Sequence, residues 1–212
     1  MAVVLPPSED SLQLVVQALA RGELCIIPTD TVYGVAAQVA PDPVARLYRV
    51  KGRPEGRPIP LLVSDIEAAR ALATEWTFEV DKLARTFWPG ALTLVVPAVP
   101  GLPQEVTAGT GTVGVRWPAC PLAESVIERS GGVLAVTSAN RSGEPPAASV
   151  EDAFRALGTS VPYILDGGSL GGGLPSTVVR VVGKEIEVIR EGAIAPEAIR
   201  RALDSLHQSD HP

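Results

Sequence analysis

The sequence predicts an α/β domain built on a mixed sheet with helices packed on its faces. Short apolar runs that are typical of strands alternate along the chain with amphipathic stretches of helical spacing. Near the end, STVVRVVGKEIEVIRE (176–191) contains two alternating runs around Gly183 and Lys184, which predicts an antiparallel hairpin. Alternation together with a hairpin favours a sheet that mixes parallel and antiparallel strands.

The first elements follow from local signals. Ser8 is predicted to cap a helix that ends near Gly22, because apolar residues recur on one face between them. A strand is predicted at 24–28, and a second helix begins at Asp42, with a proline in its first turn. The segment KGRPEGRP (51–58) then predicts irregular structure, since glycine and proline interrupt any regular element.

The remaining elements continue the alternation. Apolar runs predict strands at 59–63, 91–97, 112–118, 133–138 and 162–165. Helical periodicity predicts helices at 65–73, 78–87, 121–130 and 149–157. Because no repeat, linker or change in composition divides the chain, we expect one domain over residues 1–206 and a loose tail at 207–212.

Composition narrows the function classes. With 46% hydrophobic and 20% charged residues the chain can bury a sizeable core, and its net charge of −6 argues against a general nucleic-acid or membrane-surface binder. Cys25 and Cys120 predict neither a disulfide framework nor a metal site, which favours a reducing compartment. Since the start lacks a signal peptide and the apolar run from Ala91 is too short to span a bilayer, we expect a cytoplasmic protein without membrane contact.

Two motif matches lack the context that their chemistry requires. GTGTVG (109–114) fits the dinucleotide pattern, but a predicted strand follows it where a helix is needed. GGSLG (167–171) fits the nucleophile elbow of hydrolases, yet the two histidines, His207 and His211, both lie in the predicted tail. We therefore expect neither a Rossmann site nor a hydrolase triad, and two histidines without a third ligand make no metal site.

Four polar clusters sit at or near the ends of apolar runs and are candidates for one site. They are PTDT, KGRPEGRP, VRWP and TSANRSG. Strand ends in an open α/β sheet form crevices, so these clusters are predicted to meet in one cleft. A buried strand that ends in Thr29, Asp30 and Thr31 would then form a wall of that cleft.

Each cluster also has a plainer interpretation. KGRPEGRP contains three positively charged residues and a single acidic one, Glu55. This excess of positive charge would suit a triphosphate, although a solvated surface loop fits the charge pattern as well. TSAN offers hydroxyls and an amide for a nucleotide, but the same residues make caps and turns. Arg116 interrupts an apolar strand and could hold a ligand carboxylate or face solvent, and Arg190 carries the same ambiguity. Ser176 follows glycines that permit close backbone approach.

At these residues the chain resembles a known family. Seven segments in order, from about Leu12 to Ile199, are similar to the YrdC/TsaC family of threonylcarbamoyl-AMP synthases: PTDTVYGV, KGRP, FWPGALTLVV, VGVRWP, VTSANRSGEP, PSTVV and VIREGAI. The resemblance implies a YrdC-like twisted mixed sheet with helices on both faces and a large concave cleft. It also implies condensation of L-threonine, bicarbonate and ATP to threonylcarbamoyl-AMP and pyrophosphate, for the threonylcarbamoyladenosine modification of tRNA.

The resemblance assigns residues by position. Thr31, Arg116 and Ser176 would bind L-threonine. Residues that would bind the nucleotide, with Lys51 and Arg53 also catalytic, are Lys51, Arg53, Arg57, Thr112, Ser138, Asn140 and Arg190. The sequence departs from the family twice, with Arg57 where many relatives have asparagine and Leu62 where some have a histidine near the amino acid.

The implied chemistry needs no protein nucleophile. A carbamate formed from threonine and bicarbonate attacks the α-phosphate of ATP, so positioning and charge neutralisation supply the catalysis. Mg²⁺ is expected with ATP rather than in a site of protein ligands. The family also implies transient contact with other tRNA threonylcarbamoylation proteins, and the early end of the chain implies the short form, without the extra C-terminal domain of longer relatives.

Two other functions compete with the synthase. One is an RNA-binding or ribosome-associated module without synthase activity, which the acidic charge balance disfavours. The other is a carbamoyl-transfer domain of the kind found in hydrogenase-maturation proteins, which the lack of zinc-finger cysteines disfavours. Direct contact with tRNA and the oligomeric state stay open at this point.

Overall fold

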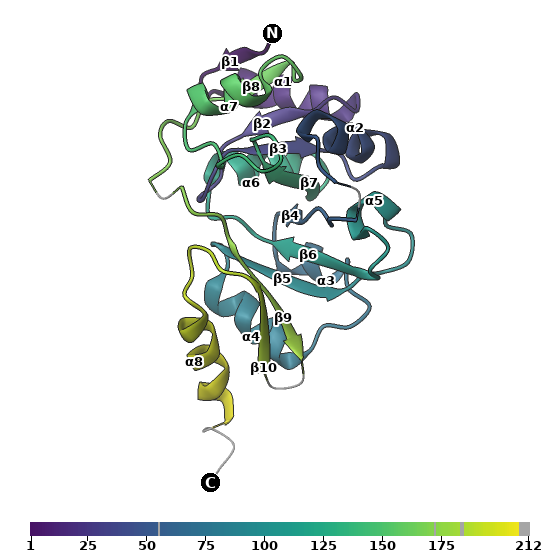
Figure 1. The fold of residues 1–212 in the computed structure, drawn as a ribbon, viewed down its shortest axis with the longest axis vertical. Coiled ribbons are helices and arrows are strands. Elements are labelled where there is room, and N and C mark those ends of the chain that lie inside the picture. The colour runs from purple at the N-terminus through teal and green to yellow at the C-terminus, as the bar shows by residue number, and fades with distance from the viewer. Residues whose placement is uncertain (55, 172, 183–184, 208–212) are drawn as a thin grey trace.

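A computed structural model describes residues 1–54, 56–171, 173–182 and 185–207. Ten strands form one sheet, stacked along the long axis of the molecule in the order β1-β8-β2-β3-β7-β4-β6-β5-β9-β10 (Figure 1). The strands are β1 Val3–Leu5, β2 Cys25–Ile27, β3 Gly34–Ala37, β4 Leu61–Val63, β5 Leu92–Pro97, β6 Thr112–Arg116, β7 Val133–Ser138, β8 Tyr163–Leu165, β9 Thr177–Val182 and β10 Glu185–Arg190.

The sheet is mixed, as predicted. β1 and β2 pair with β8 in parallel, as do β4 with β6 and β5 with β9. β2–β3, β3–β7, β4–β7, β5–β6 and β9–β10 are antiparallel. The predicted hairpin is therefore confirmed as β9–β10, while its turn at Gly183 and Lys184 lies outside the described residues.

Helices cover both faces of this sheet (Figure 1). They are α1 Glu9–Ala20, α2 Pro41–Lys51, α3 Ile66–Arg70, α4 Phe78–Phe87, α5 Gln104–Thr107, α6 Pro121–Arg129, α7 Val150–Leu157 and α8 Pro196–His207. The predicted cap of α1 is confirmed, because the Ser8 hydroxyl accepts a hydrogen bond from the Ser11 backbone N–H at 3.3 Å. Within the described residues, no helix combines the length and the apolar character that crossing a membrane requires.

Strand alternation divides the core into two clusters, one on each face. Ile26, Val35 and Leu61 point to the larger cluster, which α2, α4, α7 and α8 cover. The neighbouring residues Ile27 and Ala36 point to the smaller cluster, which α1 and α6 cover. Because side chains alternate along a strand, these short strands can bury residues on both faces.

Some elements differ from the prediction. β1, β3, α5 and α8 were not predicted; β3 reads GVAA, whose residues have weak strand propensity, and it forms because β2 and β7 pair with both of its edges. α2 continues through Lys51, so the first residue of KGRPEGRP is helical. Likewise His207, the first residue of the predicted tail, is the last residue of α8, and 208–212 lie outside the described residues.

Candidate active site

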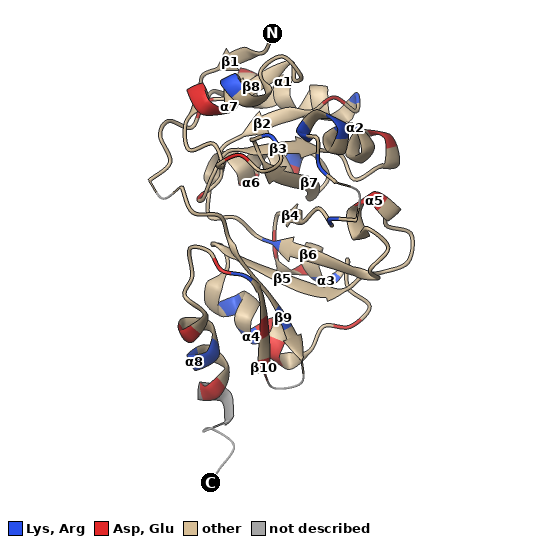
Figure 2. Cartoon of the chain, viewed as in Figure 1, with Lys and Arg blue, Asp and Glu red and all other residues tan. Residues whose placement is uncertain are grey.

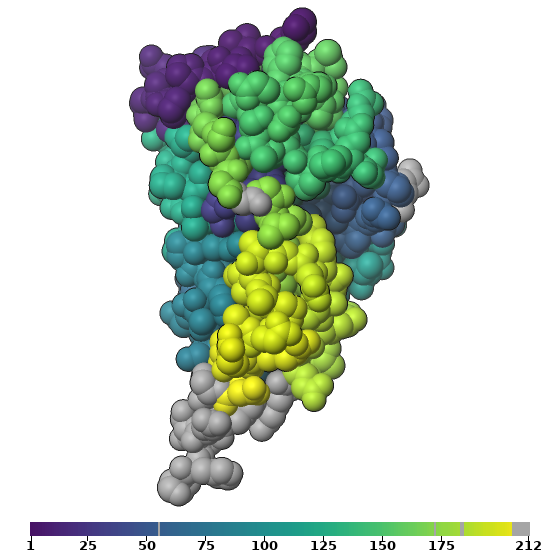
Figure 3. All heavy atoms as spheres, turned by 60° about the vertical axis from the view of Figure 1, so that its left-hand side comes forward, coloured from purple at the N-terminus to yellow at the C-terminus, as the bar shows by residue number. Residues whose placement is uncertain are grey.

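A polar cavity of about 170 Å³ lies on the sheet face that bears α1 and α6. Residues from β3, β4, β5, β6, β7 and β10 and from connecting segments line it: Thr29, Thr31, Val32, Gly34, Arg53, Pro60, Leu62, Thr93, Arg116, Val136, Thr137, Ser138, Pro146, Pro175, Ser176 and Arg190. The predicted clusters PTDT, KGRPEGRP, VRWP and TSANRSG therefore each contribute a residue to one site. In Figure 3, the light-green part of the chain that leads into β9 lies near the middle of the molecule.

The turn after β2 explains why a buried strand ends in hydroxyl groups. The Thr29 Oγ1 atom accepts hydrogen bonds from the backbone N–H groups of Thr31 and Val32, each at 3.2 Å, and donates to the Val32 carbonyl at 2.6 Å. Since its hydrogen is used there, Thr29 accepts from the Thr31 hydroxyl, 3.0 Å away. Both threonines are buried, so the turn satisfies its own backbone and presents Thr31 to the cavity.

Arg116 is buried, with 5% of its surface exposed, and its guanidinium is held from three sides. Nε donates to the Gly90 carbonyl at 2.9 Å and Nη1 to the Thr31 hydroxyl at 3.1 Å. Nη2 pairs with the Asp30 carboxylate at 2.5 Å. A guanidinium has five N–H groups, so two remain for a ligand.

Sequence reasoning did not assign Asp30 a role. A signal existed, because a charge in a buried strand requires a partner of opposite sign, and Asp30 stands in the polar cluster predicted to meet Arg116. Burial lowers the pKa of Arg116, and the charge of Asp30 opposes that effect. Asp30 itself does not line the cavity, so it acts on the site through Arg116.

Ser176 and Arg190 form a second group on the cavity wall, together with Thr93, which sequence reasoning also missed. The hydroxyls of Thr93 and Ser176 are 2.8 Å apart, and both residues are buried. Arg190 Nη2 donates to the carbonyl of Ser176 at 2.7 Å and to its hydroxyl at 3.1 Å. Gly192 permits this packing, since a Cβ atom there would lie 2.3 Å from the Pro175 carbonyl oxygen.

Lys51 is the last residue of α2 and Arg53 follows two positions later, and the two side chains make different contacts. Lys51 is buried, and its Nζ donates to the Ser138 carbonyl and, at 2.6 Å, to the Asn140 carbonyl, so it supports the end of β7 from behind the cavity. Arg53 lines the cavity, and its guanidinium donates to the carbonyls of Arg57 at 3.1 Å and Pro58 at 2.8 Å.

These cations influence one another. Burial, followed by the charge of Arg53, lowers the pKa of Lys51 to about 8. Desolvation followed by the charge of Arg53 also lowers the pKa of Arg190. Within the described part of the chain, Lys51, Arg53 and Arg190 have no carboxylate partner, unlike Arg116. Uncompensated positive charge beside buried hydroxyl groups is the arrangement that binds an anion.

Besides Lys51, three predicted nucleotide residues lie outside this cavity. Asn140 lines a neighbouring hollow of about 400 Å³ that shares Pro146 with the cavity, and its amide also closes a turn by donating to the Arg141 and Glu144 carbonyls. Thr112 lies further along β6 at another hollow. The Arg57 side chain is exposed and lines neither the cavity nor the Asn140 hollow.

Leu62 lies within the cavity wall, on the strand next to Arg116. An apolar side chain there offers neither a proton donor nor an acceptor. Any polar contact with a ligand on this side therefore has to come from the hydroxyls and arginines around Leu62.

Comparison with known proteins identifies the family. The family model Sua5_yciO_yrdC, described as "Telomere recombination", matches residues 17–192. A threonylcarbamoyl-AMP synthase of Bacillus subtilis is 37% identical over 89% of this chain and 55% of its own length, and a putative one of Mycobacterium tuberculosis is 38% identical over 89% and 87%.

Solved structures agree with the sequence comparison. P. abyssi Sua5 complexed with L-threonine superposes with a TM-score of 0.90 at 32% identity, over 95% of this chain and 60% of that one. This chain thus spans little more than half the length of some of the relatives that it matches. The match of the family model over most of the sequence, together with relatives of this similarity, establishes that the chain belongs to the Sua5/YciO/YrdC family.

Proposed function

We propose that this protein is an L-threonylcarbamoyladenylate synthase, a nucleotidyltransferase that condenses L-threonine, bicarbonate and ATP to threonylcarbamoyl-AMP and pyrophosphate. The observation that carries the proposal is the cavity itself. Three cationic side chains without carboxylate partners among the described residues, Lys51, Arg53 and Arg190, stand in or directly behind its wall next to buried hydroxyls. This donor set suits a polyphosphate and an amino acid held side by side.

Threonine would bind at the Arg116 end. The two N–H groups of Arg116 that remain would hold the threonine carboxylate, because a guanidinium and a carboxylate pair through two parallel hydrogen bonds. The hydroxyls of Thr31 and Ser176 lie in the same wall and would contact the rest of the amino acid. The similar P. abyssi Sua5 was solved in complex with L-threonine, which supports this assignment.

The phosphates of ATP would bind against Arg53 and Arg190, the latter beside Ser176, with Lys51 of α2 holding the Ser138 carbonyl at the end of β7. A volume of about 170 Å³ is small for a nucleotide, so we propose that the nucleoside extends past Pro146 into the hollow beside Asn140. Contacts of Thr112 and Arg57 with the nucleotide stay predictions, since neither side chain lines these two spaces.

In the proposed reaction the threonine amine and bicarbonate form a carbamate, whose oxygen attacks the α-phosphate and expels pyrophosphate. The arginines orient the two reactants and stabilise the negative charge that develops on phosphate oxygens. Among the described residues, no group of three or more His, Cys, Asp or Glu side chains could hold a metal ion. We therefore propose that Mg²⁺ enters as part of the substrate MgATP, bound by phosphate oxygens.

We propose a cytoplasmic setting for this reaction, because both cysteines are free thiols, as is usual in a reducing compartment. The product would pass to other proteins of tRNA threonylcarbamoylation through transient contact. Acidic and basic residues are interspersed over the elements in Figure 2, and this distribution gives little support to the alternative of a general RNA-binding module.

Pyrophosphate release tests the proposal. Purified protein is supplied with ATP, Mg²⁺ and bicarbonate, with and without L-threonine, and the product is identified by mass. We expect release that depends on threonine and the mass of threonylcarbamoyl-AMP. ATP binding without any effect of threonine would leave the family assignment intact and reject the proposed substrate.

A further inference from the structure

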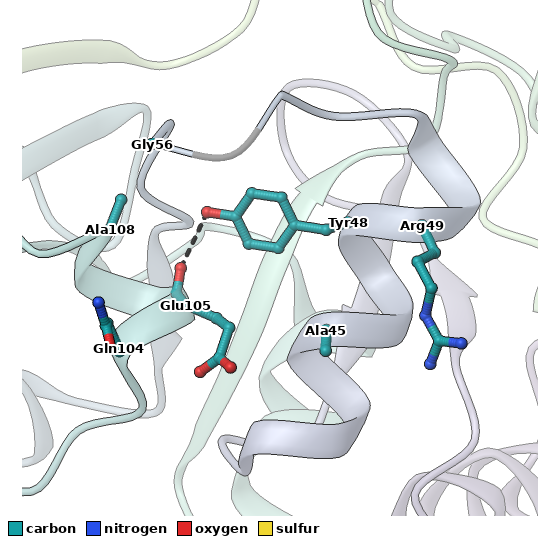
Figure 4. Close-up of a pocket in the computed structure, with 7 residues that line it drawn as sticks. All are labelled: Ala45, Tyr48, Arg49, Gly56, Gln104, Glu105 and Ala108. Atoms are coloured by element: carbon teal, nitrogen blue, oxygen red, sulfur yellow. Dashed lines mark hydrogen bonds between the residues drawn. The ribbon is translucent and has the colours of Figure 1, made fainter.

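A hollow of about 550 Å³ lies between α2 and α5, beside the loop that joins α2 to β4. Small residues line much of it, namely Ala45, Gly56 and Ala108. Figure 4 shows the Tyr48 ring projecting from α2 across this hollow toward α5, with its hydroxyl directed at the backbone of Glu105. The ring therefore bridges two elements that are far apart in the sequence.

The Tyr48 hydroxyl lies within hydrogen-bond distance of two carbonyl oxygens. The Arg57 oxygen is 2.5 Å away and the Glu105 oxygen is 2.9 Å away. A hydroxyl has one hydrogen, so it can donate to only one of these carbonyls at a time. The shorter contact favours Arg57, and Glu105 is the alternative partner.

The Arg57 carbonyl also accepts the Nε–H of Arg53 at 3.1 Å. Tyr48 and the cavity arginine Arg53 therefore share one acceptor atom in the loop between α2 and β4. The ends of this loop are anchored separately: Gly52 adopts a left-handed conformation with φ of 58°, and the Ile59 N–H donates to the Val106 carbonyl at 3.0 Å. Between these anchors, the Arg57 carbonyl is the point at which α2, the loop and Arg53 meet.

We propose that Tyr48 is a positioning residue, whose hydroxyl holds the Arg57 carbonyl so that Arg53 stays directed into the active-site cavity. Tyr48 does not line that cavity and acts on it only through Arg53. The residue contributes geometry and takes no part in the chemistry. This inference rests on the proposed function where it names ATP as the ligand of Arg53.

Tyr48→Phe tests the inference, because it keeps the ring in the hollow and removes the hydroxyl. Tyr163→Phe is the matched control, since the Tyr163 hydroxyl makes no hydrogen bond within the described residues. We expect Tyr48→Phe to weaken MgATP binding about fivefold in calorimetry, the usual effect of one lost hydrogen bond, and to leave the KM for threonine within twofold. MgATP affinity equal to that of the Tyr163→Phe control would overturn the proposal.

A double-mutant cycle separates positioning from general support of the fold. If Tyr48 acts through Arg53, Tyr48→Phe has no further effect on MgATP affinity in an Arg53→Ala background. Additive losses would show that Tyr48 acts independently of Arg53 and would contradict the proposal.

Backbone hydrogen exchange supplies a measurement that does not depend on the reaction. We expect the loop between Gly52 and Ile59 to exchange faster in Tyr48→Phe than in the wild type and the control, while α1 is unchanged. If wild-type protein shows no threonine-dependent pyrophosphate release, the proposed function fails, and the exchange result still decides whether Tyr48 holds the loop. Unchanged exchange in that loop would reject the inference whatever the activity.

Discussion

The sheet face that bears α1 and α6 has two regions of opposite character, although the same strands pass through both. Where the helices cover it, Ile27, Ala36 and Leu134 pack against apolar helix residues. Further along β7, beyond that cover, Ser138 lines the polar cavity. Along β7 the residues thus change from apolar to polar where the helix cover ends, so a single strand contributes to both the core and the site on this face.

The two regions also differ in the charged groups that they contain. The covered region is formed mainly by apolar side chains and includes the Cys25 thiol, whose pKa burial raises to about 12, so the thiol stays neutral. The cavity region instead holds Arg116, which is buried but paired, and three cations that lack a carboxylate partner in the described structure. A fold optimised for stability alone would not place these charges together, so their position indicates a binding function.

The largest effect is expected at Arg116, the buried charge of the cavity region that is paired with a carboxylate. Arg116→Ala leaves the Asp30 carboxylate unpaired, and breaking a buried pair costs about 3–5 kcal/mol of stability, so this variant tests folding as well as function. Arg116→Lys keeps the charge but loses the planar fork that suits a carboxylate. We expect Arg116→Lys to reduce kcat/KM for threonine about 100-fold, measured by pyrophosphate release, with the fold retained in circular dichroism. Activity near that of the wild type would remove Arg116 from the proposed threonine site.

Leu19→Ala makes the matching change in the covered region. Leu19 is fully buried in α1, so the substitution leaves a cavity and should lower the free energy of unfolding by about 3 kcal/mol in chemical denaturation. Activity per folded molecule should stay within twofold, because Leu19 does not line the cavity. A change of several-fold in the KM for threonine would instead mean that the two regions are mechanically coupled.

Thr93→Val tests the cavity wall beside Ser176, because valine has nearly the same volume as threonine but lacks its hydroxyl. It removes one of the two hydrogen-bond partners of the Ser176 hydroxyl, which we expect to raise the KM for threonine about fivefold, as one lost hydrogen bond would. Thr93→Ser should restore the wild-type value, since it returns the hydroxyl. A KM for threonine in Thr93→Val equal to that of the wild type would show that the Thr93 hydroxyl does not contribute to threonine binding.

The smallest effect is expected from pH, through Lys51. With a pKa of about 8, this ammonium loses its charge as pH rises, so kcat/KM for ATP should fall about fourfold between pH 7 and pH 8.5. Lys51→Arg should shift this decrease in kcat/KM to higher pH. If the pH profile of Lys51→Arg is identical to that of the wild type, the titrating group is not Lys51.

The same pKa has a consequence for stability with the opposite sign. Burial lowers the folded-state pKa of Lys51 below its usual value, so the unfolded chain binds more protons between the folded and the unfolded pKa. The contribution of Lys51 to stability should therefore increase as pH rises from about 8 toward the ordinary lysine pKa of 10.5. If activity falls as the pH rises while the midpoint of unfolding stays constant or increases, the loss of activity comes from this titration and not from alkaline denaturation.

Much of the fold follows from local pattern. α4 begins and ends at the predicted residues 78 and 87, because Thr77 caps it and its apolar face is regular. By contrast, the sequence did not predict β3 or α8. GVAA has weak strand propensity, and the polar residues at the end of the chain suggested a loose tail where α8 ends. Pairing with β2 and β7 stabilises β3, and packing against α4 and β10 supports α8, and neither kind of contact is visible in a local window.

The site was predictable to a similar extent. Sequence motifs identified Thr31, Arg53, Arg116, Ser138, Ser176 and Arg190, all of which line the cavity. Asp30 and Thr93 were missed because their importance lies in a single long-range contact each, to Arg116 and to Ser176. A single sequence gives no measure of such contacts.

By itself, the sequence determined the kinds of element, the mixed sheet and the polar groups at the ends of its strands, because these depend on periodicity and on short-range turn chemistry. Tertiary structure alone decided which polar groups meet, which cations are left without a carboxylate partner among the described residues, and that Lys51 supports the cavity from behind while Arg53 enters it. The physical reason is that pairing and burial are set by neighbours distant in the chain. Arg116 and Asp30, 86 positions apart, acquire their roles only when β2 and β6 lie in one sheet.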